Sequence, residues 1–325
     1  MLNPLLDVRR IVLAAAILVA ALLPASAADW PTRPIHFIVP FPAGGSTDIA
    51  GRVVADYLSR KLGQQVIVEN KSGANGNIGM EYVARSAPDG YTVLVGTDAV
   101  SSNPHVYTMD FDPLQALVPV IQIATQPIAL AAHPSLGLTT IADLTAKVKQ
   151  QPGLRFATGS GVGSLQAMVA LWYAKLAGIT LVQVPYRGGG EAIHDLIAGN
   201  VQLGSLGTSP LIPYYKAHTL NMLAQSTARR SPALPDVPTF EEAGLAGLVI
   251  DQRTGVLVPT GTPPEIAQRL NAEINEALKD PKVRQSISEQ AQEPAGGTAE
   301  EFSRIVRDDS DKYGRLVKEL AIAVQ

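Results

Sequence analysis

Short apolar runs alternate with longer amphipathic segments along most of this chain. The short runs are rich in Val, Ile and Leu and are bounded by Gly, Pro, Asn and Asp, a pattern that predicts β-strands. Between them apolar residues recur at helical spacing, which predicts α-helices. Strands that alternate with helices favour an α/β fold with a parallel sheet, whose loops after the carboxyl ends of the strands form a ligand-binding edge. The predicted strands lie at 37–39, 65–70, 91–97, 154–158, 181–186, 201–207 and 220–226, and the last predicted helices at 263–279, 281–290 and 299–318.

Two segments do not fit this alternation. Residues 118–133 are almost uninterrupted apolar sequence whose prolines disfavour a helix, and residues 248–259 also have the composition of extended chain. A chain of 325 residues is long for one core, so we interpret both segments as crossings between two domains. We therefore expect two α/β lobes joined by two extended hinge crossings, with a ligand cleft between them. The predicted division is 28–125 plus 254–325 for lobe I and 126–253 for lobe II.

Residues 37–63 combine a strand, a glycine turn and the start of a helix. Gly44 and Gly45 lack a Cβ atom, so the backbone can turn sharply and approach a ligand closely. The helix start leaves N–H groups without intrahelical partners and is partly positive, so it can bind an anion without Lys or Arg. The alternative is an ordinary βα turn with Ser46 or Thr47 as N-cap. The candidate ligand-binding residues of this first glycine turn are Phe41, Pro42, Ala43, Gly44, Gly45, Ser46, Thr47 and Asp48, of which Asp48 most simply complements the helix dipole.

A second glycine turn, residues 159–164, repeats this design before another helix. Its glycines have the spacing G-x-G-x-G, and the strand at 181–186 ends without an acidic residue, so the dinucleotide-binding fingerprint is not matched. For Ser160 we expect a helix-capping or ligand-bonding hydroxyl. The candidate residues are Gly159, Ser160, Gly161, Gly163 and Ser164, and the apolar face of the following helix is predicted to hold Leu165, Met168, Val169, Trp172 and Leu176.

Further polar residues lie on the same predicted edge of the sheet. The loop at 97–103 follows a strand and begins with Thr97, Asp98 and Ala99. Asp98 is suited either to bind an amine or a hydroxyl or to cap a turn. Arg187, the basic residue of a glycine-rich loop on this edge, either contacts an anionic ligand or is a solvated side chain.

Composition narrows the function classes. The net charge is −3 and the pI is about 6.0, which argues against a nucleic-acid or anionic-membrane partner. The chain has no cysteine, so disulfides, thiolate metal sites and a cysteine nucleophile are excluded. Its five histidines are scattered without metal-ligand spacing, and it contains no Gly-x-Ser-x-Gly elbow. We expect no metal, no cofactor and no catalytic residues.

The N-terminus predicts export. Arg9 and Arg10 precede an apolar run at 11–23, which is followed by the small-residue site that ends at Ala27. These features describe a secretory signal peptide, residues 1–27, and the run is shorter than the roughly 20 residues of a membrane span. An uncleaved anchor is the alternative. We expect cleavage after Ala27 and a periplasmic mature protein that is not embedded in the membrane.

Seven motifs resemble one known family, the substrate-binding proteins of tripartite tricarboxylate transporters, also called Bug receptors. They are WPTRP at 30–34, VPFPAGGSTD at 39–48, ENKSGANGNIG at 69–79, APDGY at 87–91, VPYRG at 184–188, SPALPDVPTF at 231–240 and GTPP at 261–264. The resemblance covers essentially the whole mature chain. It implies a type II periplasmic binding-protein fold that captures carboxylates and delivers them to a two-component membrane permease. It also implies that one ligand carboxylate lies between the two glycine turns, partly through water, and it adds Tyr186 to the candidate residues.

This chain departs from the family pattern at positions that bear on the ligand. Thr208 and Ser209 stand where Asp-Asn-type residues are common, Arg253 and Thr254 stand where an aromatic residue often occurs, and Asp98 replaces a smaller polar residue. We therefore expect an intact proximal carboxylate site with an individual distal pocket, to which Thr208 and Ser209 contribute. The predicted function is a monomeric periplasmic receptor for a small carboxylate that closes by hinge motion. Alternatives are a receptor that reports to a signalling partner and an exported α/β hydrolase.

Overall fold

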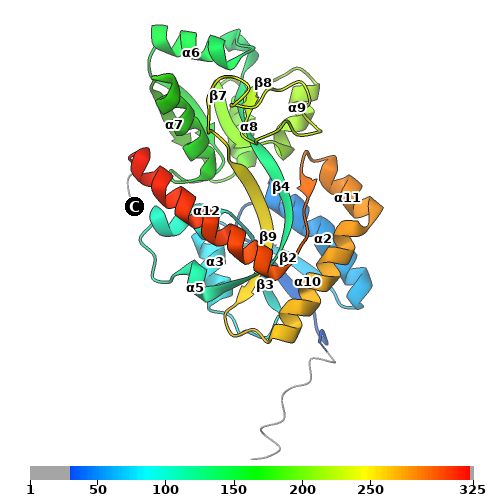
Figure 1. Ribbon diagram of the computed structural model, residues 1–325. Helices are drawn as coiled ribbons and strands as arrows, with labels where there is room; N and C mark the ends of the chain where they lie inside the picture. The colour runs from blue at the N-terminus through cyan, green and yellow to red at the C-terminus, as the bar shows by residue number, and fades with distance from the viewer. Residues whose placement is uncertain (1–29, 323–325) are drawn as a thin grey trace, which may run out of the picture.

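The computed structural model describes residues 30–322 (Figure 1), so the predicted signal peptide, 1–27, lies outside the described residues. The first elements are β1 (Ile35–Val39), α2 (Ser46–Leu62), β2 (Val66–Asn70), α3 (Asn77–Ala84), β3 (Thr92–Thr97), α4 (Ala99–Ser102) and α5 (Pro113–Ala116). The middle of the chain forms β4 (Leu117–Ala132), α6 (Ile141–Gln150), β5 (Leu154–Thr158), α7 (Leu165–Ala177), β6 (Leu181–Pro185), α8 (Gly189–Ile197), β7 (Leu203–Gly207), α9 (Ile212–Lys216) and β8 (Asn221–Gln225). The last part forms β9 (Asp251–Pro259), α10 (Pro264–Lys279), α11 (Pro281–Ser288), β10 (Glu293–Pro294) and α12 (Ala299–Glu319).

These strands form one mixed sheet. The strand order is β2-β1-β3-β9-β4-β7-β5-β6, with β8 and β10 also paired to β4. Strand β1 runs parallel to β2 and β3, and β5 runs parallel to β6 and β7, as the alternation of strands and helices predicts. The expected parallel pairing does not extend to the centre, where the two crossing strands are antiparallel to their neighbours: β9 pairs antiparallel with β3, and β4 pairs antiparallel with β7.

The two long central strands are the predicted crossings. Strands β4 and β9 pair antiparallel from Leu117 opposite Pro259 to Pro127 opposite Asp251, because the chain leaves along one and returns along the other. The second half of β4 then pairs with β7 and β8. Figure 1 shows β4 and β9 running together between a group of helices that includes α2, α3 and α10 and another that includes α6, α7 and α8. The crossings are therefore confirmed as extended chain, while the lobe boundaries within them stay a prediction.

Strand β4 contributes to both of the largest clusters of buried apolar side chains. Its apolar residues within 120–124 belong to the cluster formed with β1, α2 and α10, and its alternate residues Ile128, Leu130 and Ala132 belong to the cluster formed with α6, β5 and α7. Burying a side chain of this size contributes about 1.5–3 kcal/mol, so each half of β4 is held by a different core.

Helix α12 also packs on both parts of the molecule. Phe302 and Val306 join a cluster with α3 and β3, whereas Tyr313 and Leu316 join the cluster of α6 and α7. Figure 1 shows this helix lying diagonally across the central strands. The C-terminal helix therefore connects the two packing regions in addition to β4 and β9.

The predicted apolar face of the helix at 165–177 needs one correction. Leu165, Met168 and Val169 are buried, but Leu176 is 45% exposed. Tyr173, one turn earlier, is fully buried instead and donates or accepts a hydrogen bond with Thr145 of α6 at 2.8 Å. The packing of α6 against α7 selects Tyr173, which spacing alone did not distinguish.

Candidate functional site

The first glycine turn connects β1 to α2. Helix α2 begins at Ser46 and has Gly45 as its N-cap, without a side-chain capping hydrogen bond. The alternative of Ser46 or Thr47 as N-cap is therefore wrong. Gly44 has φ +81°, a left-handed conformation that favours glycine. Because no side chain caps the helix, the first N–H groups of α2 are available to an external acceptor.

Asp48, in the first turn of α2, ties this loop together. Its Oδ2 accepts hydrogen bonds from the Gly44 N–H at 3.0 Å and from Arg52 Nε at 2.9 Å, and its Oδ1 accepts one from Asn70 Nδ2 at 2.9 Å. Burial by itself raises the pKa of Asp48, but these three donors outweigh it and hold the pKa below its ordinary value. The residue is 3% exposed, so its charge is engaged inside the loop. The predicted position in the first helical turn is confirmed, with this larger structural role.

The second glycine turn connects β5 to α7 and has a different cap. Ser164 is the N-cap, and its Oγ accepts a hydrogen bond from the Ala167 N–H at 3.3 Å. Gln166 Oε1 accepts a hydrogen bond from the Gly159 N–H at 2.6 Å. Ser164, and not Ser160, therefore caps the helix, so the capping role considered for Ser160 is wrong.

A third helix begins beside the first two. Helix α8 has Gly188 as its N-cap, again without a side-chain capping bond. A Cβ atom on Gly188 would lie 2.8 Å from Pro42 Cγ of the first glycine turn, and one on Gly159 would lie 2.6 Å from the Gly189 Cα. The absence of side chains at these glycines brings the starts of α2, α7 and α8 together.

These three helix starts line one hollow, the main hollow. No charged side chain is among its lining residues, so its polar character comes from backbone N–H groups, hydroxyls and amides. Helix N-termini carry partial positive charge, and their convergence suits the site to an anion. The lining residues are Phe41, Pro42, Gly45, Ser46, Thr47, Gly159, Ser160, Gln166, Gly188, Gly189, Leu206, Gly207, Pro210 and Gln252.

Two further hollows adjoin the main one, because they share Phe41 and Ser160 with it. The second hollow also shares Gln166 and Gln252 and adds Asn75, Thr97, Asp98, Ala99, Ser102, Ser164 and Leu165. The third hollow adds residues 72–76, Tyr107, Gly161, Val162 and residues 185–187. The structure thus brings most of the predicted site residues to one cleft.

Six predicted site residues do not line these hollows. Ala43, Gly44 and Asp48 shape the first glycine turn from outside the hollows, and Gly163 packs against Val106. Thr208 and Ser209 lie behind the wall of the main hollow, both fully buried.

Ser209 instead holds a glutamine. Its N–H and its Oγ both donate to Gln126 Oε1, at 3.1 and 2.8 Å, and Gln126 Nε2 donates to Gln252 Oε1 at 3.0 Å. Gln252 then lines two of the hollows. The Oγ of Thr208 has no hydrogen-bond partner among residues 30–322.

Tyr186 and Arg187 both line the third hollow. The Tyr186 hydroxyl donates to Asp195 Oδ2 at 2.7 Å, and burial together with this carboxylate raises the pKa of Tyr186 to about 12. The Arg187 side chain is exposed, and its N–H donates to Glu191 Oε2 at 3.3 Å. Tyr186 is thus anchored to α8 by its hydroxyl, whereas the Arg187 side chain is exposed to solvent.

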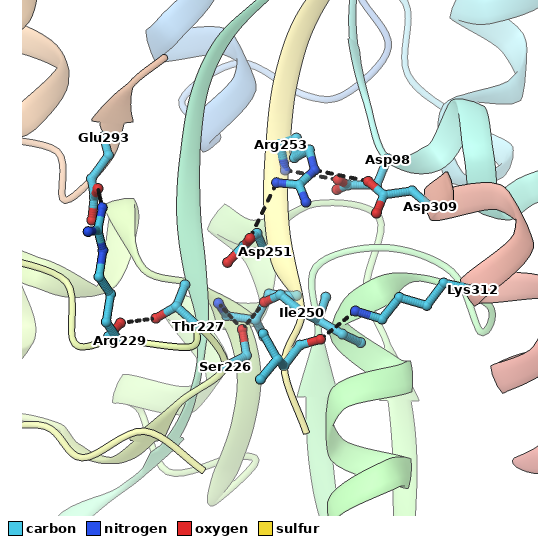
Figure 2. A network of polar contacts seen from close by, with 12 residues as sticks. Asp98, Ser226, Thr227, Arg229, Ile250, Asp251, Arg253, Glu293, Asp309 and Lys312 are labelled. Atoms are coloured by element: carbon cyan, nitrogen blue, oxygen red, sulfur yellow. Dashed lines mark hydrogen bonds and ion pairs between the residues drawn. The ribbon is translucent and has the colours of Figure 1, made fainter. Parts of the chain in front are cut away.

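Asp98 lies in a buried cluster of charges where β3 meets β9 and α12 (Figure 2). It is 6% exposed, and its Oδ1 accepts a hydrogen bond from the Arg253 N–H at 2.9 Å. The Arg253 guanidinium in turn donates to Asp309 at 2.9 Å and to Asp251 at 3.3 Å. Burial, and next the Asp309 carboxylate, raise the pKa of Asp98 to about 8. Its side chain caps no helix, so the turn-capping alternative is wrong.

The sequence did not single out Gln166 or Gln252, although both line the main and second hollows. Each carries a weak signal. Gln166 follows a glycine turn within the first turn of a helix, and Gln252 is an uncharged polar residue at the start of a crossing strand.

Two general properties of the described residues bear on function. Within residues 30–322 no group of three or more His, Asp or Glu side chains is placed to hold a metal ion. No helix in the same range is long and apolar enough to span a bilayer.

Comparison with known proteins agrees with this geometry. Residues 50–322 match the model of the tripartite tricarboxylate transporter family receptor, TctC. The protein BugT of Bordetella pertussis is 34% identical over 299 residues, which cover 91% of this chain and 92% of BugT. Rpa4515 of R. palustris, whose structure was determined with adipate, is 34% identical with a TM-score of 0.88, over 91% of this chain and 100% of that one. The periplasmic binding protein BugD is 28% identical with a TM-score of 0.86, over 91% and 100% of the two chains.

The chain belongs to the tripartite tricarboxylate transporter receptor family. The predicted family and the predicted periplasmic binding-protein fold are confirmed. Membership implies a solute-binding role in transport, a periplasmic location and membrane subunits of a tripartite transporter as partners.

Proposed function

We propose that this receptor binds a small carboxylate in the main hollow and releases it to the membrane subunits of a tripartite transporter. The carboxylate is held by the N–H groups at the starts of α2, α7 and α8 and by the hydroxyls of Ser46, Thr47 and Ser160. The role of these residues follows from their position around one hollow. The relative Rpa4515, seen with adipate, supports a carboxylate as the ligand.

One observation carries the proposal: three helix N-termini converge on a hollow that no charged side chain lines. A carboxylate loses its water shell when it enters such a site, and backbone N–H groups with aligned helix dipoles replace that shell. A hydrogen bond to a charged group contributes about 1.5–3 kcal/mol. No permanent counter-charge has to be separated when the ligand leaves, which suits a receptor that must release its cargo.

Capture and release are proposed to use the crossings. With lobe I as 28–125 plus 254–325 and lobe II as 126–253, the first glycine turn belongs to one lobe and the starts of α7 and α8 to the other. The central strands β4 and β9 then act as the hinge, and separation of Pro42 from Gly188 opens the main hollow. The receptor is proposed to work as a monomer after cleavage of the signal peptide at Ala27.

Binding is tested on protein exported from a Gram-negative host with its own N-terminus. N-terminal sequencing of the periplasmic product should begin at Ala28. Thermal unfolding and calorimetry are then measured with linear dicarboxylates, tricarboxylates, acidic amino acids, aromatic acids and uncharged analogues of each. A carboxylate that binds should stabilise the folded protein by about 2.7 kcal/mol at a hundredfold excess over Kd. Binding of only uncharged analogues, or of none of the carboxylates, would contradict the proposal.

A further inference from the structure

The orientation of two cleft amides is dictated by backbone N–H groups. A backbone N–H can only donate, so the Ser209 N–H identifies the Gln126 atom 3.1 Å away as the carbonyl oxygen. Gln126 Nε2 must then point to Gln252, where it donates to Oε1 at 3.0 Å. The Gly159 N–H fixes Gln166 Oε1 in the same way at 2.6 Å. These assignments rest on hydrogen-bond chemistry and not on a choice between two similar amide atoms.

The consequence is that Gln166 and Gln252 each have Oε1 engaged in a hydrogen bond and Nε2 free. Neither Nε2 has a hydrogen-bond partner within residues 30–322, and neither is among the fully buried atoms that lack one. Gln166 and Gln252 both line the main and the second hollow. The wall shared by these hollows therefore offers amide N–H donors to a ligand.

Asp98, at the far end of the second hollow, is compatible with an acceptor group on the ligand. The charged groups around it are Asp251 and Arg253 on β9 and Asp309 and Lys312 on α12, with Tyr313 behind them. The three carboxylates of this cluster face two cations. Burial and the Asp309 carboxylate raise the pKa of Asp98 to about 8, which favours its protonated form, a hydroxyl donor, relative to an ordinary carboxyl group.

We propose that Ser209 and Gln126 act as positioning residues that hold the Gln252 amide with its N–H group toward the cleft, so that the receptor selects ligands whose distal group is a hydrogen-bond acceptor. A second carboxylate or a carbonyl fits this wall, and an ammonium group does not. This inference rests on the proposed function, which supplies the first carboxylate in the main hollow. It also explains how Thr208-Ser209, a departure from the family pattern, affects the ligand without lining the hollow.

The most direct test reverses the orientation of the Gln252 amide by changing its partner Gln126. In Gln126→Glu the new carboxylate accepts from Ser209 but cannot donate to Gln252, so the Gln252 amide should rotate and turn its oxygen toward the cleft. Calorimetry is carried out on the full exported protein with adipate, hexanoate and aminocaproate, which share a chain length and differ in the distal group. Succinate with butyrate and aminobutyrate is used if the shorter chain binds more tightly.

The wild type should bind the dicarboxylate about 10- to 100-fold more tightly than the matched monocarboxylate. Gln126→Glu should lower the dicarboxylate affinity by a similar factor and raise the affinity for the amino acid. In a Gln252→Leu background no amide at position 252 can rotate. Adding Gln126→Glu should then leave the ratio of the dicarboxylate affinity to the monocarboxylate affinity unchanged. This double-mutant cycle separates rotation of Gln252 from the direct effect of the new charge.

A second variant changes Gln252 itself and does not depend on a change at Gln126. Gln252→Glu keeps an oxygen for Gln126 and the shape of the side chain, but places a second oxygen where Nε2 was. Because Gln252 also lines the main hollow, the new charge should weaken both ligands, but it should weaken dicarboxylate binding about 10-fold more than monocarboxylate binding.

The outcomes distinguish the two proposals. If the wild type binds monocarboxylate and dicarboxylate equally, or the amino acid more tightly than either, the inference that Ser209 and Gln126 orient the Gln252 amide is overturned. The proposed carboxylate binding would still stand. An unchanged ratio in both folded variants, Gln126→Glu and Gln252→Glu, also overturns this inference. If no carboxylate binds the wild type, the proposed function itself fails.

Discussion

The two glycine turns share one sequence pattern but use their glycines differently. In the first turn Gly44 has φ +81°, and a Cβ on Gly45 would find only Pro42 O, at 3.6 Å. In the second turn no glycine has a positive φ, but a Cβ on Gly161 would lie 2.3 Å from Tyr107 Oη and one on Gly163 would lie 2.1 Å from Val106 Cγ1. Glycine in the first turn provides backbone freedom and open space. Glycine in the second turn allows other side chains to approach.

The turns also differ in how a helix side chain holds them. Asp48 binds the first turn as a carboxylate supported by Arg52 and Asn70. Gln166 binds the second as a neutral amide to Gly159. The hydrogen bonds of a carboxylate depend on pH, whereas those of a neutral amide do not. The neutral amide also retains a free Nε2 for the ligand. A carboxylate therefore holds the first turn, whereas a neutral amide holds the second.

The largest expected effect is on stability in the second turn. Gly163→Ala places a methyl group against Val106, which is fully buried and cannot move away. We expect the free energy of unfolding to fall by about 3 kcal/mol, measured by urea denaturation. The matched control is Gly45→Ala in the first turn, where the space is open. Equal losses in the two variants would show that the comparison between the turns is wrong.

Next comes an effect on binding in the first turn. Gly45→Val keeps a permitted backbone, with φ −77°, but fills the space before the N–H groups of α2. We expect affinity for the tightest carboxylate to fall about 100-fold, equivalent to about 2.7 kcal/mol, while stability changes by less than about 0.5 kcal/mol. Calorimetry and urea denaturation on the same preparation measure both. Retained affinity in the folded variant would remove α2 from the anion site.

The smallest expected effect distinguishes the carboxylate of Asp48, which holds the first turn, from the neutral amide of Gln166, which holds the second. Asp48→Asn should lower the free energy of unfolding by about 1–2 kcal/mol at neutral pH. Because the folded pKa of Asp48 lies below its ordinary value of 3.8, this stabilisation is present above that value and is lost as pH falls through the folded pKa. The difference between wild type and Asp48→Asn should therefore shrink in acid.

The matched change in the second turn is Gln166→Leu. It should cost about 1 kcal/mol, and this cost should not change between neutral and acid pH. Urea denaturation at both pH values checks the pair. If the loss in free energy of unfolding depended on pH for Gln166→Leu, or did not depend on pH for Asp48→Asn, charge would not be what distinguishes the two side chains that hold the turns.

Much of the fold was predictable because its signals are local. Apolar runs between turn residues located the strands, and the two glycine turns marked the starts of α2 and α7. The crossings at 118–133 and 248–259 were predictable from composition alone and are the strands β4 and β9. The packing of α12 on both clusters was not, because its buried residues follow one continuous helical stripe that does not say which partner covers each turn.

Within the site, sequence identified the residues whose chemistry depends on their own neighbours. Gly44, Gly45 and Asp48 lie in one short loop, so their pattern predicted the turn and the start of the helix, but not the hydrogen bond from Asn70 to Asp48. Gln252 was beyond this approach, because a glutamine has a donor and an acceptor and its orientation depends on Gln126, far away in the chain. Ser209 was named as a pocket residue, but its contact with Gln126 was not predicted. Asp98 was ambiguous for a related reason, since its protonation is decided by burial and by Asp309.

The sequence by itself determined the elements, the glycine turns and the family, because each depends on residues close together along the chain. Only the tertiary structure decided that α8 joins α2 and α7 at one hollow, that Ser164 and not Ser160 is the cap, and which amide atoms are engaged in hydrogen bonds. Those properties are set by contacts between strands and loops that are distant in sequence. The proposed anion site thus rests on a local pattern, whereas the proposed selectivity rests on contacts that only the fold creates.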